Sequence, residues 1–501
     1  MPSRGRLLRR ASALLAFTCL LTPHPVRAAA DAWVEVRSPH FIVISNAGEK
    51  RARNMAWQFE QVQALLRRLW PWATGSFDRP LLVYAVKDER SMRMLAPEYW
   101  ERRGGVQPTS VFVTAPDAHY ISLRTDVKMD SIDTNPYRSS YWSYVALTLT
   151  SSIPHELPLW YSRGIAEVFS NTIIRTKDVQ VGLVLPWHLE RLRERSPLTL
   201  DELFGATRQS PYMTDGDRMA DFDASAWALL HYLTFGNGGK NLALFNTFSI
   251  AVGDGANVTD ALAKAYGGLP AVDSGYRRYV SKMIYMFQRV DLDVDVDQTA
   301  FAALPLSAPD ADVALARYYA ATGRPLEARA RVAAALQASP QSGAAYEVEG
   351  ILLDREDKNA EALAAFTRAV DIGGASYYGE FRYAQLSWPK APDTKEPFAK
   401  MEKSLRRAIE LRPTFGRAYA ALANVLLELD RAPESLPVAQ RAVALDAYAS
   451  FHQLTLARVL LRTGKVAEAM APAQHARALA KSAYDKNAAD QFLTFLRSKA
   501  R

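Results

Sequence analysis

Cysteine is almost absent from this sequence. Cys19 is the only one among 501 residues, and it lies within the first 30. A single cysteine cannot form an intramolecular disulfide, and loss of the first 30 residues would leave no thiol for catalysis or metal binding. The sequence therefore excludes a disulfide-stabilised fold and a cysteine enzyme.

The sequence also offers no apolar run of membrane-spanning length near its start. Ala11–Leu21 is apolar, but it is far shorter than the roughly 20 residues that cross a bilayer. It follows four arginines and precedes the small residues Ala28–Ala30, a pattern typical of a secretory signal peptide. We expect residues 1–30 to be that signal, with no transmembrane segment after its cleavage and a secreted, periplasmic protein.

Excess positive charge is concentrated in the same segment. The chain has 61 Lys and Arg against 53 Asp and Glu, and five of the arginines lie in residues 1–30, which contain no acid. The rest of the chain has an excess of only three positive charges. Because no basic block interleaved with aromatic residues remains, nucleic acid is not an expected partner.

Residues 31–290 mix strand and helix patterns. Residues 33–46 alternate apolar and polar side chains, as in a strand or hairpin, and residues 48–70 carry apolar side chains at helical spacing. Further strands are expected at 80–86 and in the two segments that follow, and a helix at 141–152. This order predicts an α+β layer.

An acidic stretch, DLDVDVDQ at 291–298, separates this region from the next. A calcium loop would need glycine and glutamate where Val296 and Ala302 stand. We interpret the stretch as an edge strand or linker, and we place the domain boundary at residue 298.

Residues 299–501 are helical and repetitive. Small residues recur at steps of 34, 39, 34 and 34, and turn positions recur with them; the alanines of the series are Ala335, Ala369, Ala408, Ala442 and Ala476. This period resembles the tetratricopeptide repeat (TPR), in which two antiparallel helices cross at small residues. We expect about five repeats, a closing helix at 483–499, and a concave face that binds a protein or peptide.

The pair His155-Glu156 invites comparison with a zinc peptidase. Zincins carry His-Glu-x-x-His on one helix, so that both histidines bind the metal. Here the fifth position is Leu159, and Pro158 would break the required helix. His155–Leu159 is therefore not a zinc motif.

The segment that follows carries a more specific resemblance. LPLWYSRGIAEVFSN, residues 157–171, resembles the peptidase-MA-like group of bacterial gluzincins, which often carry TPR units. The opening at 33–46 and DASAWALLHYL at 223–233 fit the same group. The resemblance covers about residues 31–290 and implies a gluzincin-like (thermolysin-like) α+β domain at 31–298.

The resemblance also shows which positions would hold zinc. It places the metal-binding pair at Ser143 and Leu147, the general base at Tyr144 and the third ligand at Arg163. None of these side chains suits its role, because SYVAL replaces H-E-x-x-H and Arg163 puts a cation where the metal would lie. We expect a degenerate site with no metal and no cofactor.

Trp160, Gly164 and Glu167 match the family pattern nevertheless. They allow two interpretations: maintenance of the fold, or a residual pocket that includes His155. Arg163 and Glu167 are four residues apart and could pair along a helix face. The other single histidines, His188 and His231 among them, are expected to be structural, and Asp215–Asp223 to form a solvated acidic loop.

Together these features predict an exported, non-catalytic pseudopeptidase that serves as a TPR scaffold in the cell envelope. The alternative is a hydrolase of peptides or envelope polymers with an unconventional site built from His155, Glu156 and Glu167.

Overall fold

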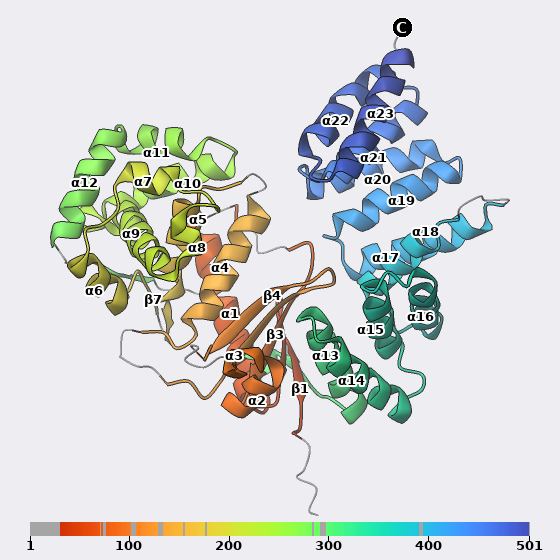
Figure 1. Ribbon diagram of the computed structural model, residues 1–501, viewed down its shortest axis with the longest axis horizontal. Helices are drawn as coiled ribbons and strands as arrows, with labels where there is room; N and C mark the ends of the chain where they lie inside the picture. The colour runs from red at the N-terminus through yellow and green to blue at the C-terminus, as the bar shows by residue number, and fades with distance from the viewer. Residues whose placement is uncertain are drawn as a thin grey trace, which may run out of the picture.

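The structure is a computed structural model that describes residues 31–70, 72–73, 77–101, 107–128, 134–153, 156–175, 178–282, 285–290, 297–389 and 394–499. The expected signal peptide, His155 and most of the acidic stretch at 291–298 lie outside the described residues. Figure 1 shows an α+β part followed by helix pairs that rise as an arc towards the C-terminus.

A six-stranded mixed sheet forms the centre of the α+β part. Its order is β4-β5-β3-β2-β1-β9, with bounds β1 Val34–Arg37, β2 Ile42–Ser45, β3 Leu81–Val86, β4 Ser110–Thr114, β5 His119–Arg124 and β9 Ala302–Pro305. Strands β2, β3 and β5 run parallel, and the outer pairs are antiparallel. The strands expected at 33–46 and 80–86 are confirmed.

Helices lie on both faces of this sheet, and further helices pack beyond them as a group at its side (Figure 1). Their bounds are α1 Glu49–Leu69, α2 Glu89–Leu95, α3 Glu98–Glu101, α4 Arg138–Ser152, α5 Leu159–Ser170, α6 Pro186–Glu194, α7 Leu200–Gly205, α8 Pro211–Thr214, α9 Gly216–Phe235, α10 Asn241–Gly253, α11 Val258–Tyr266 and α12 Leu269–Lys282. A small sheet of β6 Ile173–Ile174, β7 Val179–Val181 and β8 Gln288–Val290 lies among them, with short 3-10 turns at Asn237–Gly239 (η1) and Gln298–Ala300 (η2).

Strand β3 shows why both faces are covered. All six of its residues are buried, as expected for a central strand, and they alternate between two cores. Leu81, Val83 and Ala85 pack in the core that contains α1, α4, α5 and α9. Leu82, Tyr84 and Val86 pack in a second core, which contains α2 and the first helices of the repeat region.

Among the described residues, the repeat region consists of five helix pairs and a closing helix. The pairs are α13 Ala308–Ala321 with α14 Pro325–Ala338, α15 Gly343–Asp354 with α16 Asn359–Ile372, α17 Tyr377–Leu386 with α18 Glu396–Leu411, α19 Gly416–Glu428 with α20 Ala432–Leu445, and α21 Ser450–Arg462 with α22 Val466–Leu479, followed by α23 Ala483–Lys499. The solenoid expected from the repeat period is confirmed.

The turn and crossing positions of the repeats follow the sequence pattern closely. Gly323, Asp357, Asp430 and Gly464 all have positive φ, between 57° and 79°, because each ends a helix in the left-handed conformation. The alanines that recur through the repeats have no exposed surface, so the paired helices can approach closely there; they are Ala335, Ala369, Ala408, Ala442 and Ala476.

The domain boundary predicted at residue 298 separates segments that pack together in the structure. Strand β9 lies beyond residue 298, yet it pairs with β1 and completes the sheet. The first helix pair then covers the sheet face: Tyr84 Oη donates to Ala314 O at 2.7 Å, and Ser122 Oγ lies 2.8 Å from Tyr318 Oη. The first repeat therefore serves as a helical layer of the α+β part. Among the described residues no helix is long and apolar enough to cross a membrane.

Candidate functional site

The positions that the resemblance assigns to a zinc motif lie on α4, inside the α+β core. Tyr144 has no exposed surface and packs against Phe41, Phe59 and Phe77, with ring centroids 5.4–6.0 Å away. Leu147 is also buried, whereas half-buried Ser143 donates its hydroxyl to Ser139 O. On this helix the three side chains contribute packing and a local hydrogen bond.

Arg163, at the position of the third ligand, has a partner on another helix. Its Nε and Nη2 donate to the two carboxylate oxygens of Asp223 on α9, each at 2.6 Å. The guanidinium carbon also lies 5.4 Å from the centroid of the Trp142 ring. Burial raises the pKa of Asp223 above its ordinary value, although Arg163 opposes this shift. Such a two-pronged pair fixes α5 against α9.

Glu167 has a different partner from the one that the spacing suggested. Its carboxylate accepts a hydrogen bond from His188 Nε2 at 3.0 Å, and both side chains are buried. The pairing of Arg163 with Glu167 along one helix face is therefore wrong. Because the partners come from α6 and α9, spacing within α5 could not reveal them.

Trp160 and Gly164 have clear packing roles. Trp160 has no exposed surface. A Cβ placed on Gly164 would lie 2.7 Å from Ala226 O and 2.8 Å from Leu230 Cδ2, so only glycine lets α5 approach α9 this closely. Pro158 is the N-cap of α5, and the exposed Glu156 lies in the preceding loop, 3.6 Å from Arg208. His155 lies outside the described residues.

The acidic residues expected in a loop belong instead to the start of α9. Asp215 caps the helix by accepting from two backbone N–H groups, and Asp217 and Asp221 pair with Arg191 and Arg195. Within the described part of the chain, no three His, Cys, Asp or Glu side chains gather as metal ligands would. His231 is a core residue: it has no exposed surface and lies 2.8 Å from both Tyr279 Oη and Gly182 O.

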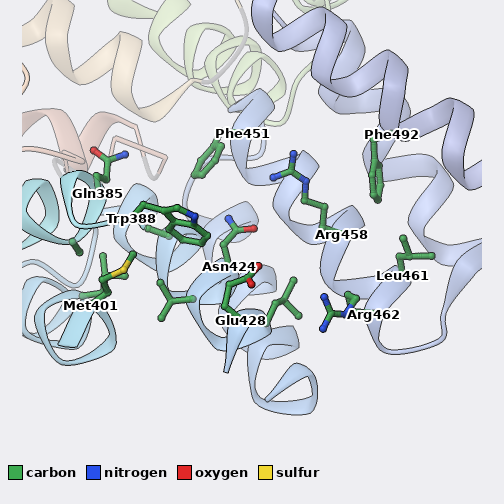
Figure 2. Close-up of a pocket in the computed structure, with 15 residues that line it drawn as sticks. Gln385, Trp388, Met401, Asn424, Glu428, Phe451, Arg458, Leu461, Arg462 and Phe492 are labelled. Atoms are coloured by element: carbon green, nitrogen blue, oxygen red, sulfur yellow. The ribbon is translucent and has the colours of Figure 1, made fainter. Parts of the chain in front are cut away.

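The solenoid contains an open groove of about 500 Å³. Its lining comes from α17, α19, α21 and α23, with additions from α18 and from Trp388 in the loop after α17. Buried Met401, Leu405 and Val425 form part of the lining, while the aromatic residues Trp388 and Phe451 are 43% and 44% exposed. Figure 2 shows these aromatic side chains around the hollow. Exposed aromatic rings beside apolar side chains are typical of a peptide-binding surface.

Two polar side chains of the lining, those of Arg458 and Asn424, can form hydrogen bonds with a ligand in the groove. Half-buried Arg458 on α21 has no hydrogen-bond or ion-pair partner in the described part of the chain, and burial lowers its pKa below the ordinary value. Asn424 on α19 donates to Ala420 O and Thr455 Oγ1, both at 3.0 Å. Its Oδ1 can therefore accept from a peptide N–H.

From the sequence, the groove was predicted only as the concave face of the repeats, and no residue was assigned to it. Likewise, the sequence interpretation missed His188 and Asp223 as partners of Glu167 and Arg163. A signal for the groove does exist, because Arg458 and Asn424 each lie six residues before a turn position, Gly464 and Asp430. For His188 no comparable signal exists, since its partner is 21 residues away on another helix.

Comparison with known proteins gives likenesses to TPR structures. The crystal structure of YrrB, "a TPR protein with an unusual peptide-binding site", is 15% identical, covers 36% of this chain and 91% of its own, and has a TM-score of 0.30. TTC0263, a thermophilic TPR protein of Thermus thermophilus, is 19% identical over 36% of this chain and 95% of its own, with a TM-score of 0.27. The pilus biogenesis factor PilW is 15% identical over 39% and 92%, with a TM-score of 0.30.

These TM-scores lie below 0.5, so the assignment of the repeats rests on the helix pairs and turns described above. No model of a known protein family matches the chain, and no curated protein matches its sequence.

Proposed function

We propose that this protein is a scaffold whose solenoid groove binds a segment of a partner protein. The groove between α17, α19, α21 and α23 carries the proposal. It combines exposed Trp388 and Phe451 with Arg458, a half-buried cation without an acidic partner in the described chain. Binding is favoured when a complementary segment pairs with a half-buried charge and covers exposed aromatic rings, because both changes lower the free energy of the complex.

For the α+β part we propose a degenerate gluzincin-like domain without catalytic activity. Three observations support this proposal: Tyr144 and Leu147 are buried in packing positions, and Arg163 is held by Asp223. In this interpretation an ion pair between helices takes the place of a metal and fixes α5 on α9. The domain then contributes a rigid sheet to the first repeat.

We also propose that the protein is exported to the cell envelope. The proposal rests on the arginines, apolar run and small residues of positions 1–30. Fractionation of cells and N-terminal sequencing of the mature protein test it. A protein that keeps residues 1–30 and stays with the cytoplasmic fraction would contradict it.

The groove can be tested with a displayed library of random peptides selected against the chain from residue 31. We expect selected peptides to lose binding to the variants Trp388→Asp and Phe451→Asp, which place a charge on the groove wall. Leu326→Asp on α14 is the matched control, because Leu326 is 80% exposed and lies away from the groove. Equal binding to all three variants would contradict the proposal.

The second candidate is a hydrolase, and one observation favours it. The Glu167 carboxylate and the His188 imidazole are hydrogen-bonded in the α+β part, and such a pair can serve in acid–base chemistry. Metal analysis of protein purified without chelator separates the two candidates. Stoichiometric zinc that is lost in Glu167→Ala or His155→Ala would favour the hydrolase over the scaffold.

A further inference from the structure

Two arginines occupy the same position in different repeats. Arg317 lies six residues before Gly323, the turn glycine of the first pair, and Arg458 lies six residues before Gly464, the turn glycine of the fifth pair. Arg317 therefore stands on α13 as Arg458 stands on α21. The partners of Arg317 therefore indicate what kind of group Arg458 can bind.

Arg317 is held by two carboxylates. Its Nη2 donates to Glu347 Oε1 on α15 at 3.0 Å, and its Nε lies 3.9 Å from Asp117 Oδ2. Asp117 belongs to the turn between β4 and β5, and its backbone O accepts from Tyr377 Oη on α17 at 2.5 Å. The β4–β5 turn thus contacts α13 and α17 directly, and Arg317 links the turn to α15.

Arg458 lacks both kinds of carboxylate within the described chain. Glu347 follows Arg317 by 30 residues, but the residue 30 after Arg458 is Ala488, on the closing helix α23. None of the described turns of the α+β part lines the groove at Arg458, and the groove is open. Figure 2 shows its side chain extending into the hollow that Phe451 and Asn424 also border.

The charges around Arg458 favour an acidic occupant. The described lining of the groove contains two cations, Arg458 and Arg462, and one carboxylate, that of Glu428. Arg462 also lies 3.7 Å from Asp430, outside the lining, so Arg458 is the lining cation with no ion-pair partner in the described structure. A carboxylate at Arg458 would form a charge-assisted hydrogen bond in a partly dry site.

We propose that the groove binds a turn of a partner protein that presents an Asp or Glu side chain to Arg458, as the β4–β5 turn presents Asp117 to Arg317. Apolar or aromatic residues beside that acid pack against Trp388 and Phe451, and a backbone N–H of the turn donates to Asn424 Oδ1. This inference rests on the proposed function, because it names the chemistry of the segment that the groove binds.

Selected peptides test the inference directly. Disulfide-closed peptides with randomised tips, together with linear peptides ending in a free carboxylate, are selected against the chain from residue 31, and dissociation constants are measured by fluorescence polarisation. We expect closed peptides with Asp or Glu at the tip to be selected, and replacement of that acid by its amide to raise Kd about tenfold or more.

The variants Arg458→Gln and Arg441→Gln complete the design. Arg458→Gln should raise Kd for the acidic peptide by the same factor and leave Kd of the amide peptide unchanged. Arg441→Gln, at an exposed arginine on α20 away from the groove, should change neither. Circular dichroism of each variant checks that the helices stay folded.

Three outcomes would overturn the inference in different ways. Closed peptides that bind equally well with acid or amide would refute the role of Arg458 while leaving the groove function intact. Selection of linear peptides alone, with binding lost on amidation, would identify a chain end as the occupant instead of a turn. Absence of binding by any peptide would refute the proposed function itself.

Discussion

The two ends of the solenoid use the same kind of residue for different purposes. At α13, Arg317 is enclosed between Glu347 and Asp117, so the sheet and the solenoid form one core. At α21, Arg458 stands in an open groove with neither carboxylate. The repeat therefore supplies the cation, whereas the segment that supplies the acid decides whether the contact is internal or a binding site.

Removing the enclosed arginine should have the largest effect on stability. Arg317→Ala leaves Glu347, which has no exposed surface, and Asp117 without their cation. Loss of one partner of a buried ion pair costs about 3–5 kcal/mol, so we expect a fall of that order in the free energy of unfolding. Urea denaturation measures it, and a fall below about 1 kcal/mol would contradict the enclosed role.

Acid should lower the free energy of unfolding of the α+β part. Burial lowers the pKa of His231 to about 4, well below its ordinary value of 6.5. Below pH 6.5 the unfolded chain binds a proton that the folded chain does not bind until about pH 4, so stability falls as the pH falls through this window. The loss attributable to His231 should reach about 3 kcal/mol.

Urea denaturation at pH 7 and pH 4.5, with His231→Gln as the comparison, isolates this contribution. The variant has lower stability at pH 7 but should lose less on acidification. The arginines of the groove keep their charge over this range, so they do not contribute to this acid effect. An identical pH dependence in both proteins would contradict the prediction.

A smaller effect is expected from the hydrogen bond that ties α17 to the sheet. Tyr377→Phe removes the hydroxyl that donates to Asp117 O, and a single hydrogen bond contributes about 1 kcal/mol. Urea denaturation measures the change. Tyr383→Phe on the same helix is the control, because no hydrogen bond of the Tyr383 hydroxyl is present among the described residues. Equal changes in both variants would show that the tie is unimportant.

The smallest effect on stability is expected from the open arginine. Arg458→Ala removes a half-buried cation that has no partner in the described chain, so the free energy of unfolding should change by less than about 0.5 kcal/mol. Thermal unfolding of Arg458→Ala and Arg317→Ala, measured side by side, compares the two losses of stability directly. A loss as large as that of Arg317→Ala would mean that Arg458 also has a structural role.

Much of the fold could be predicted from the sequence because the signals are local. The repeat period located the turns at Gly323, Asp357, Asp430 and Gly464, since only a few residue types adopt positive φ without strain. The closing helix at 483–499 was predicted with the bounds that the structure shows. The packing role of Gly164 was also predicted, as one of two interpretations, and the structure supports it, because a Cβ at this position would lie 2.7 Å from Ala226 O.

The partners of charged residues were harder to predict. Spacing suggested that Arg163 pairs with Glu167, but Asp223 and His188 are their partners, from helices that follow in the chain. The division at residue 298 similarly separated β9 from the sheet that it completes. Such pairings depend on which elements meet in space, and a sequence pattern within one element carries no information about that.

The sequence by itself therefore determined the helices of the solenoid, their turns and the repeat position that Arg317 and Arg458 share. Only the tertiary structure decided that the β4–β5 turn reaches Arg317 and that the groove at Arg458 stays open. The physical reason is that helix period and turn conformation are set by neighbouring residues, whereas the environment of a charge is set by residues far away in the chain.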